Sequence, residues 1–204
     1  MTVVFVIPRK TIRRVRLWLR RSADLFLVIG VVCVGWYTFD SLRARGFQTY
    51  EKRVLADTLK AGHPPLRTPI KWMTKGKIIG RLDIPRIGID AIVLEGVDAK
   101  TLRLGVGHIP GSPLPGQRGN ISLAAHRDTF FRALRHIRVY DRIRLTTPRG
   151  SSVYEVDWTK IVGPRDIWVL KSGGHNMLTL ITCYPFYMVG AAPDRFIVRA
   201  HMVS

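Results

Sequence analysis

Short apolar runs recur along the chain from about residue 77 to its end, separated by glycine, proline and polar residues. Runs of this length, rich in Val, Ile, Leu and Thr and bounded by turn formers, predict β-strands. We predict eight strands, at residues 78–84, 90–96, 119–126, 142–147, 152–162, 166–170, 178–183 and 195–203. Only residues 99–104 and 130–137 have a helical pattern, and both segments are short. The pattern predicts an all-β domain, which is either a closed barrel or a sandwich.

The first part of the chain has a different pattern. Residues 25–39 contain no charge, and with their flanks they predict a helix over residues 22–42. A helix of about 20 residues is ~30 Å long, which is enough to cross a bilayer. Trp36 and Tyr37 lie near its outer end, where amphipathic rings favour the membrane interface. The seven basic residues between positions 9 and 21 place the N-terminus in the cytoplasm by the positive-inside rule.

A fifteen-residue apolar core is also the length of a cleaved signal peptide. The residues that follow it, DSLRARG at 40–46, contain no small-x-small cleavage pattern. We therefore favour an uncleaved signal anchor in the cell membrane, with a single membrane pass and the globular domain outside the cytoplasm. A mature chain that began near residue 45 would exclude this interpretation.

A stalk is predicted between the anchor and the globular domain. Residues 46–61 place apolar side chains at helical spacing and predict a short amphipathic helix. Gly62-His63-Pro64-Pro65 predicts its end, because proline lacks an amide donor and clashes with the preceding turn. The predicted organisation is a basic cytoplasmic N-terminus (1–21), a transmembrane signal anchor (22–42), a stalk and linker (43–77) and a globular domain (78–204).

The chain is strongly basic, with 33 Lys and Arg against 14 Asp and Glu and a formal net charge of +19. Such a charge is compatible with nucleic-acid binding. It is spread along the chain, however, with a net +8 in residues 1–60 and +11 in residues 61–204, and no helix-turn-helix, zinc-ligand or RNA-binding pattern accompanies it. We therefore predict no nucleic-acid partner, and a basic exterior that faces an anionic membrane or cell wall.

Three residues of types that suit cysteine chemistry lie at the ends of predicted strands. Cys183 ends the run LTLIT, Arg195 begins the run twelve residues later, and His126 ends the run NISLAA. The other cysteine, Cys33, lies inside the predicted anchor, so we expect no disulfide between the two. A thiol, an imidazole and a guanidinium together favour acyl transfer, with a nucleophile, a proton carrier and an oxyanion donor.

These residues carry a resemblance to a known family. Residues 178–183 read LTLITC, Arg195 stands in APDRFIV, His126 stands in LAAHRDTFF, and residues 107–120 read GHIPGSPLPGQRGN. The motifs, their order and their spacing resemble those of the sortases, which are cysteine transpeptidases, over residues 78–203. The segment after the cysteine most resembles the class D branch, with class E next. The resemblance implies the eight-stranded β-barrel of that family.

The resemblance implies a role for each motif residue. Cys183 would be the nucleophile rather than an inert buried cysteine, and His126 would protonate the leaving amine and deprotonate the incoming one. Arg195 would stabilise the oxyanion or position the substrate backbone. Arg199 shares the strand face of Arg195 by period-two geometry, and only the motif selects between them.

Three further residues are candidate supporting or substrate-binding groups. Thr182 either hydrogen-bonds near the site or simply favours the strand. His108 is interpreted as structural or pocket-lining, and Asp128 as a support for a neighbouring arginine or for the histidine loop rather than as a third triad member. The loops at 163–177 and 184–193 are predicted to form the walls of a substrate groove.

The predicted function is that of a membrane-anchored sortase, a thiol hydrolase and acyltransferase. It would cleave a C-terminal LPxT-[GA]-like sorting signal on secreted proteins through a thioester on Cys183. It would then transfer the acyl fragment to an amine on a cell-wall precursor or on another protein. No organic cofactor and no metal are expected.

Two alternatives belong to other classes. One is a cysteine transpeptidase of the L,D type, whose motif resembles SHGCxR and does not fit TLITCYPF around Cys183. The other is a non-enzymatic basic membrane protein that binds wall polymer or nucleic acid. A reactive thiol and an inactive Cys183→Ala variant would separate an enzyme from such a binding protein.

Overall fold

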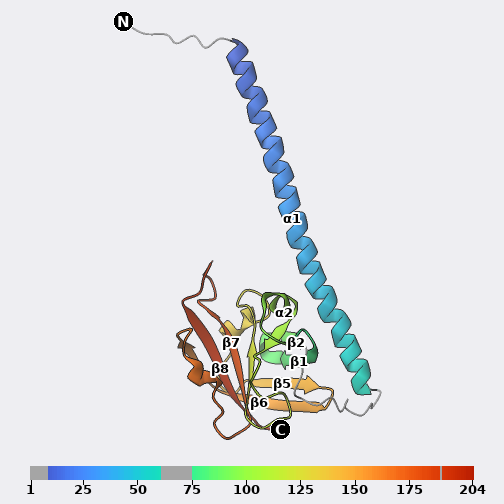
Figure 1. Cartoon of the computed structure of the whole chain (residues 1–204), viewed down its shortest axis with the longest axis vertical. Helices are drawn as coiled ribbons and strands as arrows, with labels where there is room; N and C mark the ends of the chain where they lie inside the picture. The colour runs from blue at the N-terminus through green and yellow to red at the C-terminus, as the bar shows by residue number, and fades with distance from the viewer. Residues whose placement is uncertain (1–8, 61–74, 189) are drawn as a thin grey trace. The chain divides into compact units, whose positions relative to one another are not determined.

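Eight strands close into a barrel in the computed structural model, which describes residues 9–60, 75–188 and 190–204 (Figure 1). The strands are β1 (Ile78–Ile84), β2 (Ile89–Glu95), β3 (Val106–His108), β4 (Asn120–Ala124), β5 (Arg142–Thr147), β6 (Gly150–Val162), β7 (Met177–Tyr184) and β8 (Asp194–Met202). Their order around the barrel is β1-β2-β3-β4-β7-β8-β6-β5. The β2–β3 and β4–β7 pairs are parallel and the other pairs are antiparallel. The prediction of an eight-stranded barrel is therefore confirmed.

Two details of the strand prediction were wrong. Residues 166–170 form no strand but the 3-10 helix η4 (Ile167–Leu170). The turn before η4 is closed in both directions, because Asp166 accepts a hydrogen bond from the Gly163 N–H (2.7 Å) and its own N–H donates to the Gly163 carbonyl (3.1 Å). The strand that the pattern missed is β3, whose three residues are too few to show an alternation.

The short helices connect the strands. Helix α2 (Ala99–Leu104) was predicted with these bounds, and Asp98 caps it by accepting hydrogen bonds from the N–H groups of Lys100 and Thr101. The predicted helix at 130–137 is the 3-10 helix η3 (Arg132–His136). A further 3-10 turn, η2 (Pro85–Ile87), joins β1 to β2, and Gly88 ends it at φ 67°, where a side chain would be strained.

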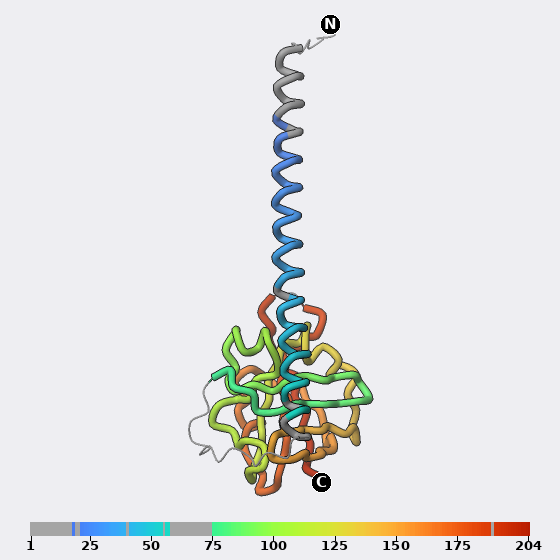
Figure 2. The backbone as a smooth tube through the Cα atoms, turned by 90° about the vertical axis from the view of Figure 1, so that its right-hand side faces the viewer, coloured from blue at the N-terminus to red at the C-terminus, as the bar shows by residue number. Residues whose placement is uncertain are grey.

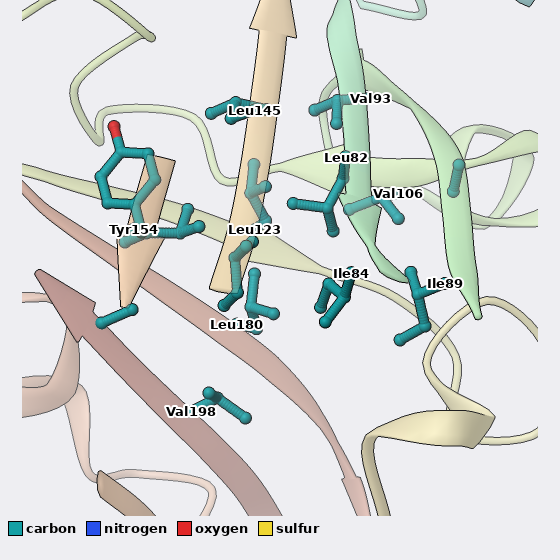
Figure 3. Packing of buried hydrophobic residues seen from close by; sticks show 14 of the residues in the cluster. Leu82, Ile84, Ile89, Val93, Val106, Leu123, Leu145, Tyr154, Leu180 and Val198 are labelled. Carbon is teal, nitrogen blue, oxygen red and sulfur yellow. The ribbon is translucent and has the colours of Figure 1, made fainter. Parts of the chain in front are cut away.

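Alternate residues of the strands fill the barrel. Figure 3 shows buried side chains from several strands meeting in its interior, among them Leu82, Val93, Leu123, Leu180 and Val198. Each of these five is fully buried. Burying one such side chain stabilises the fold by about 1.5–3 kcal/mol, so the interior is the main source of the barrel's stability.

The helix α1 (Arg9–Lys60) is continuous where the sequence predicted an anchor helix and a separate stalk helix. Residues 43–46 include a single glycine and no proline, so no strong breaker separates the two segments. Within α1, Arg21–Val54 is apolar and long enough to cross a membrane, with a mean hydropathy of 1.8 in its most apolar window. The predicted break at 62–65 lies outside the described residues.

The last part of α1 belongs to the same compact unit as the barrel, Gly46–Ser204, and the residues before it form a second unit. Gln48 is buried and makes two hydrogen bonds to the barrel backbone. Its Oε1 accepts from the Ile92 N–H (2.8 Å) and its Nε2 donates to the Leu104 carbonyl (2.6 Å). Phe47 packs beside it against Ile92 and Leu94. Figure 2 shows the teal part of α1 running past the barrel.

Candidate active site

Strand pairing brings Cys183 and Arg195 together at one end of β7 and β8. Cys183 of β7 is the direct antiparallel partner of Arg195 of β8. Strand β4 runs parallel to β7, with Ala124 level with Ile181. His126 lies two residues past the end of β4, and Cys183 lies two residues past Ile181. The pairing of β4 with β7 therefore directs the chain at His126 toward the end of β7 that carries Cys183.

The side chains of Cys183 and Arg195 leave the same face of the sheet. In a strand, successive side chains alternate between faces, and residues paired across strands share a face. Leu178, Leu180 and Thr182 point into the barrel and are buried, so Cys183 points outward. Its side chain is half-buried, whereas His126 is exposed, and a peptide lying on the outer face could reach both.

Thr182 links β7 to the segment that follows β4. Its hydroxyl donates to the Ala125 carbonyl at 2.8 Å, and the Ala125 N–H donates to the Ile181 carbonyl at 3.2 Å. Thr182 is 2% exposed, so water does not compete for this bond. Of the two interpretations left open by the sequence, the structure favours the hydrogen-bonding one, in which Thr182 fixes the main chain just before His126.

Arg195 is held at the start of β8 by main-chain oxygens. Its Nη1 donates to the carbonyls of Ala192 (3.2 Å) and Asp194 (2.9 Å). A guanidinium has five N–H donors. Both of these bonds use Nη1, so among the described contacts Nε and Nη2 stay available for a substrate oxygen.

Arg199 shares the face of Arg195, as predicted, but lies in a different environment. It is 6% exposed, and its Nη2 donates to the Val169 carbonyl in η4 at 2.6 Å. Burial lowers the pKa of Arg199 by removing water from the guanidinium, and the charge of Asp157 opposes this effect. Its pairing partner is Thr179, four residues or ~13 Å along β7 from Cys183. Arg195, not Arg199, is therefore level with the thiol.

His108 is buried in β3 with both ring nitrogens engaged. Nδ1 lies 2.8 Å from Glu95 Oε2, and Nε2 lies 2.9 Å from the Ser112 hydroxyl and 3.1 Å from the Pro113 carbonyl. On β4, the partner of His108 is Leu123, three residues before His126. This arrangement fits the structural interpretation of His108, because it fastens the loop after β3 and presents no nitrogen to Cys183. Asp128 is exposed two residues beyond His126.

The sequence analysis overlooked Arg127. This residue is 9% exposed, and its guanidinium donates to three carbonyls of the β7–β8 loop, those of Pro185 (3.0 Å), Met188 (2.6 Å) and Gly190 (2.8 Å). An arginine in a chain with 33 basic residues carries no signal of burial, and the motif drew attention to its neighbour His126. Only the fold shows that Arg127 points inward.

Two hollows of the surface lie elsewhere. One of about 300 Å³ is bordered by β2 and η3, and one of about 570 Å³ by η2 and η3, and both are lined by Arg135 and His136. Neither includes Cys183, His126 or Arg195. Among the described residues, no group of three His, Cys, Asp or Glu side chains is arranged to hold a metal ion. The candidate site is therefore recognised by its strand register and its chemistry rather than by a cavity.

The family model and the curated relatives that match this chain all belong to one family. The model of the sortase domain matches residues 82–203. Sortase D of Bacillus subtilis (strain 168) is 39% identical over 130 residues, which are 63% of this chain and 66% of that protein. The chain thus spans about two thirds of the length of this relative. Sortase A of Bacillus anthracis is 28% identical over 199 residues, which are 89% of this chain and 93% of that protein.

Solved structures agree with the sequence relatives. A Clostridium perfringens sortase D5 transpeptidase superposes with a TM-score of 0.65 at 26% identity, covering 76% of this chain and 99% of that one. Clostridium perfringens sortase C with the C-terminal cell wall sorting motif gives a TM-score of 0.61 at 26% identity, covering 75% and 85%. The barrel is therefore a known architecture, that of solved sortases.

Proposed function

Because the chain belongs to the sortase family, we propose that it is a membrane-anchored cysteine transpeptidase that acts on C-terminal sorting signals. One observation carries this proposal. Cys183 and Arg195 are paired across β7 and β8, and His126 follows the end of β4, which runs beside β7. A nucleophile, a proton carrier and a two-donor cation in this arrangement suit attack on a peptide carbonyl.

In the first half of the reaction, the Cys183 thiolate attacks the carbonyl carbon of the scissile peptide bond. A C–S bond forms, and the carbonyl oxygen takes up negative charge, which the Arg195 guanidinium stabilises. The C–N bond then breaks, and His126 donates a proton to the leaving amine. The product is a thioester between Cys183 and the N-terminal fragment.

In the second half, an acceptor amine attacks the thioester carbon and gives a proton to His126. The new C–N bond forms, the C–S bond breaks, and the thiolate returns. His126 thus ends the cycle protonated as it began, and the peptide acyl group has moved from one amine to another. No redox partner is required, because no atom changes oxidation state.

The proposed substrate is a secreted protein with an LPxT-[GA]-like signal near its C-terminus. A structural relative, the Clostridium perfringens sortase C, was solved with a C-terminal cell wall sorting motif, which supports this class of substrate. The proposed acceptor is an amine on a cell-wall precursor or on a protein subunit. The exposed position of His126 beside the thiol leaves room for either amine to approach.

The proposed location follows from α1. Residues 22–42 of the candidate span, with their uncharged core at 25–39, would cross the cell membrane once, and the basic residues before them would keep the N-terminus in the cytoplasm. The catalytic barrel would then stand on the outer side, where both the secreted substrates and the wall acceptor are found.

A peptide panel tests the proposal. The full-length chain in detergent is mixed with LPxTG, LPxTA and LAxTG peptides, with and without a soluble amine, beside the Cys183→Ala variant. We expect cleavage and amine-dependent transfer with at least one peptide, and neither with the variant. Cleavage that persists in Cys183→Ala, or that ignores the peptide sequence, would overturn the proposal.

A further inference from the structure

Arg127 hydrogen-bonds the loop that follows Cys183 and is itself the neighbour of His126 in the chain. It follows His126 directly in the chain. From there its Nη1 reaches the Pro185 carbonyl and its Nη2 reaches the carbonyls of Met188 and Gly190. The β7–β8 loop begins two residues after Cys183. The Arg127 side chain therefore connects the main chain next to His126 with the main chain of the loop that follows Cys183.

The bonding of Arg127 is unusual for a buried cation. Among the residues that the structure describes, no carboxylate oxygen lies within ion-pair distance of its guanidinium. Removing a cation from water is costly unless its donors are well satisfied. Here three carbonyl oxygens, at 2.6–3.0 Å, provide that satisfaction. If the only role of this side chain were to fill space, an apolar side chain would do so without the free-energy cost of removing a charge from water.

The loop has other contacts, but Arg127 makes most of the described side-chain bonds to its main chain. Phe186 packs edge-on against Phe196 of β8 with ring centroids 5.3 Å apart. Arg135 of η3 lies over the ring of Tyr187 at 5.3 Å from its centroid. Tyr187 is itself exposed, so this second contact is weak. These two contacts hold side chains; Arg195 binds one main-chain carbonyl near the end of the loop, and Arg127 binds three.

We propose that Arg127 is a positioning residue, which locks His126 and the β7–β8 loop into one rigid unit beside Cys183. The structural part of this inference, the link made by the Arg127 hydrogen bonds, rests on geometry alone. Its effect on catalysis rests on the proposed function. Arg127 has no contact with the reacting atoms. It acts by fixing where the imidazole and the loop stand relative to the thiol.

The fork shape of the guanidinium is essential to this role. Two different nitrogens bind acceptors at the start and in the middle of the loop, which a single ammonium group cannot do. Arg127→Lys keeps the charge and most of the volume but loses the fork. A misplacement of about 1 Å can cost ~100-fold in rate, so we expect kcat of Arg127→Lys to fall about 10- to 100-fold with a smaller change in KM.

The test compares full-length wild-type chain, Arg127→Lys and Arg127→Gln in detergent. The matched control is Arg132→Lys, which makes the same change at an exposed arginine of η3. Three quantities are measured: amide hydrogen exchange of the β7–β8 loop and of β1 and β2, the alkylation rate of Cys183 across pH, and kcat per titrated thiol.

We expect both Arg127 variants to exchange loop amides at least about 10-fold faster while β1 and β2 keep the wild-type rate, with the control unchanged. The pH profile of Cys183 alkylation should change in the same two variants, because His126 no longer keeps a fixed place beside the thiol. Loop exchange and per-thiol kcat equal to wild type would overturn the proposal. Faster exchange throughout the barrel in both variants would also overturn it, because Arg127 would then support the whole fold.

The measurements separate this inference from the proposed function. Exchange and alkylation need no sorting-signal peptide, so they report on the lock even if no peptide in the panel is cleaved. If the wild-type chain cleaves peptides and the lock is absent, only the inference fails. If the lock is present and the wild-type chain cleaves nothing, only the proposed function fails.

Discussion

Cys183 and Arg195 are directly opposite each other in the antiparallel pair of β7 and β8. Residues in such a pair have Cα atoms about 4.5–5.5 Å apart, and their side chains leave the same face. The separation of the thiol from the guanidinium is therefore set by the hydrogen-bonded ladder of the barrel. The proposed nucleophile and the proposed oxyanion donor are thus neighbours before any substrate binds, which is the condition for electrostatic stabilisation of a transition state.

Arg195→Lys tests the oxyanion role. Lysine keeps the charge but cannot hold main-chain carbonyls and a substrate oxygen in one plane, so we expect kcat/KM to fall by about 100- to 1,000-fold. The measurement is steady-state cleavage of a signal peptide that the wild type accepts. Arg132→Lys, at an exposed position of η3, is the control and should keep wild-type kinetics. Equal activity of Arg195→Lys and the wild type would contradict the assignment.

His126 and His108 should respond differently to substitution. His126→Ala removes the proposed proton carrier, so we expect kcat to fall by about 100- to 10,000-fold with little change in stability. His108→Asn removes the ring nitrogen Nε2 that contacts the Ser112 hydroxyl and the Pro113 carbonyl, so we expect a loss of about 1–3 kcal/mol in the free energy of unfolding. The comparison uses kcat per titrated thiol beside thermal unfolding. A larger loss of per-thiol kcat in His108→Asn than in His126→Ala would reverse the two roles.

The pair of Arg86 and Asp141 predicts a pH dependence of stability. Burial alone would raise the pKa of Asp141, but hydrogen bonds from the Arg86 guanidinium and the Arg138 N–H hold this pKa below its usual value. A carboxyl with a lowered folded-state pKa stabilises the fold fully above its unfolded pKa of about 4, and loses this contribution as the pH falls through the folded pKa.

We therefore expect the melting temperature of wild type to fall below about pH 4 more steeply than that of Asp141→Asn, which cannot titrate. Thermal unfolding from pH 7 to pH 2 measures the difference. Asp128→Asn is the matched control, because Asp128 is exposed and should leave the acid limb unchanged. Parallel curves for wild type and Asp141→Asn would show that the Arg86 pair does not contribute to acid stability.

Gln48 should stabilise the contact of α1 with the barrel. Gln48→Ala leaves the Ile92 N–H and the Leu104 carbonyl without their partner in a buried place, at a cost of about 1–3 kcal/mol. We expect faster amide exchange at β2 and a lower melting temperature for the full-length chain. Tyr50→Ala, on the same helix at a position that is 66% exposed, is the control. Equal effects of the two substitutions would mean that the Gln48 bonds contribute nothing specific.

The sequence predicted the strands that have a long alternation or a motif, and it identified Cys183, His126 and Arg195 as candidates. It failed where tertiary contacts decide local structure. η4 has a strand-like composition, yet the Gly163–Asp166 turn bends it, and its Val169 carbonyl is bound by both Asn120 and Arg199. These partners lie far away in the sequence, so no local pattern could reveal them.

The same limit applies to the residues that support the site. Gln48 lies 44 residues from Ile92, and Arg127 lies 58 residues from Pro185. Both are polar residues, and nothing in the sequence near them indicates burial. Each is buried by segments that lie far from it toward the C-terminus. The parallel pairing of β4 with β7, which leads the chain toward His126, is likewise not encoded by composition.

The intact mass of the full-length chain after brief mixing with the peptide panel tests the central claim most directly. The account predicts a mass gain equal to the N-terminal fragment of the accepted peptide, present in wild type, absent in Cys183→Ala and removed by a soluble amine. A fragment that stays attached in Cys183→Ala, or peptide cleavage with no such adduct even when no amine is present, would contradict a thioester on Cys183.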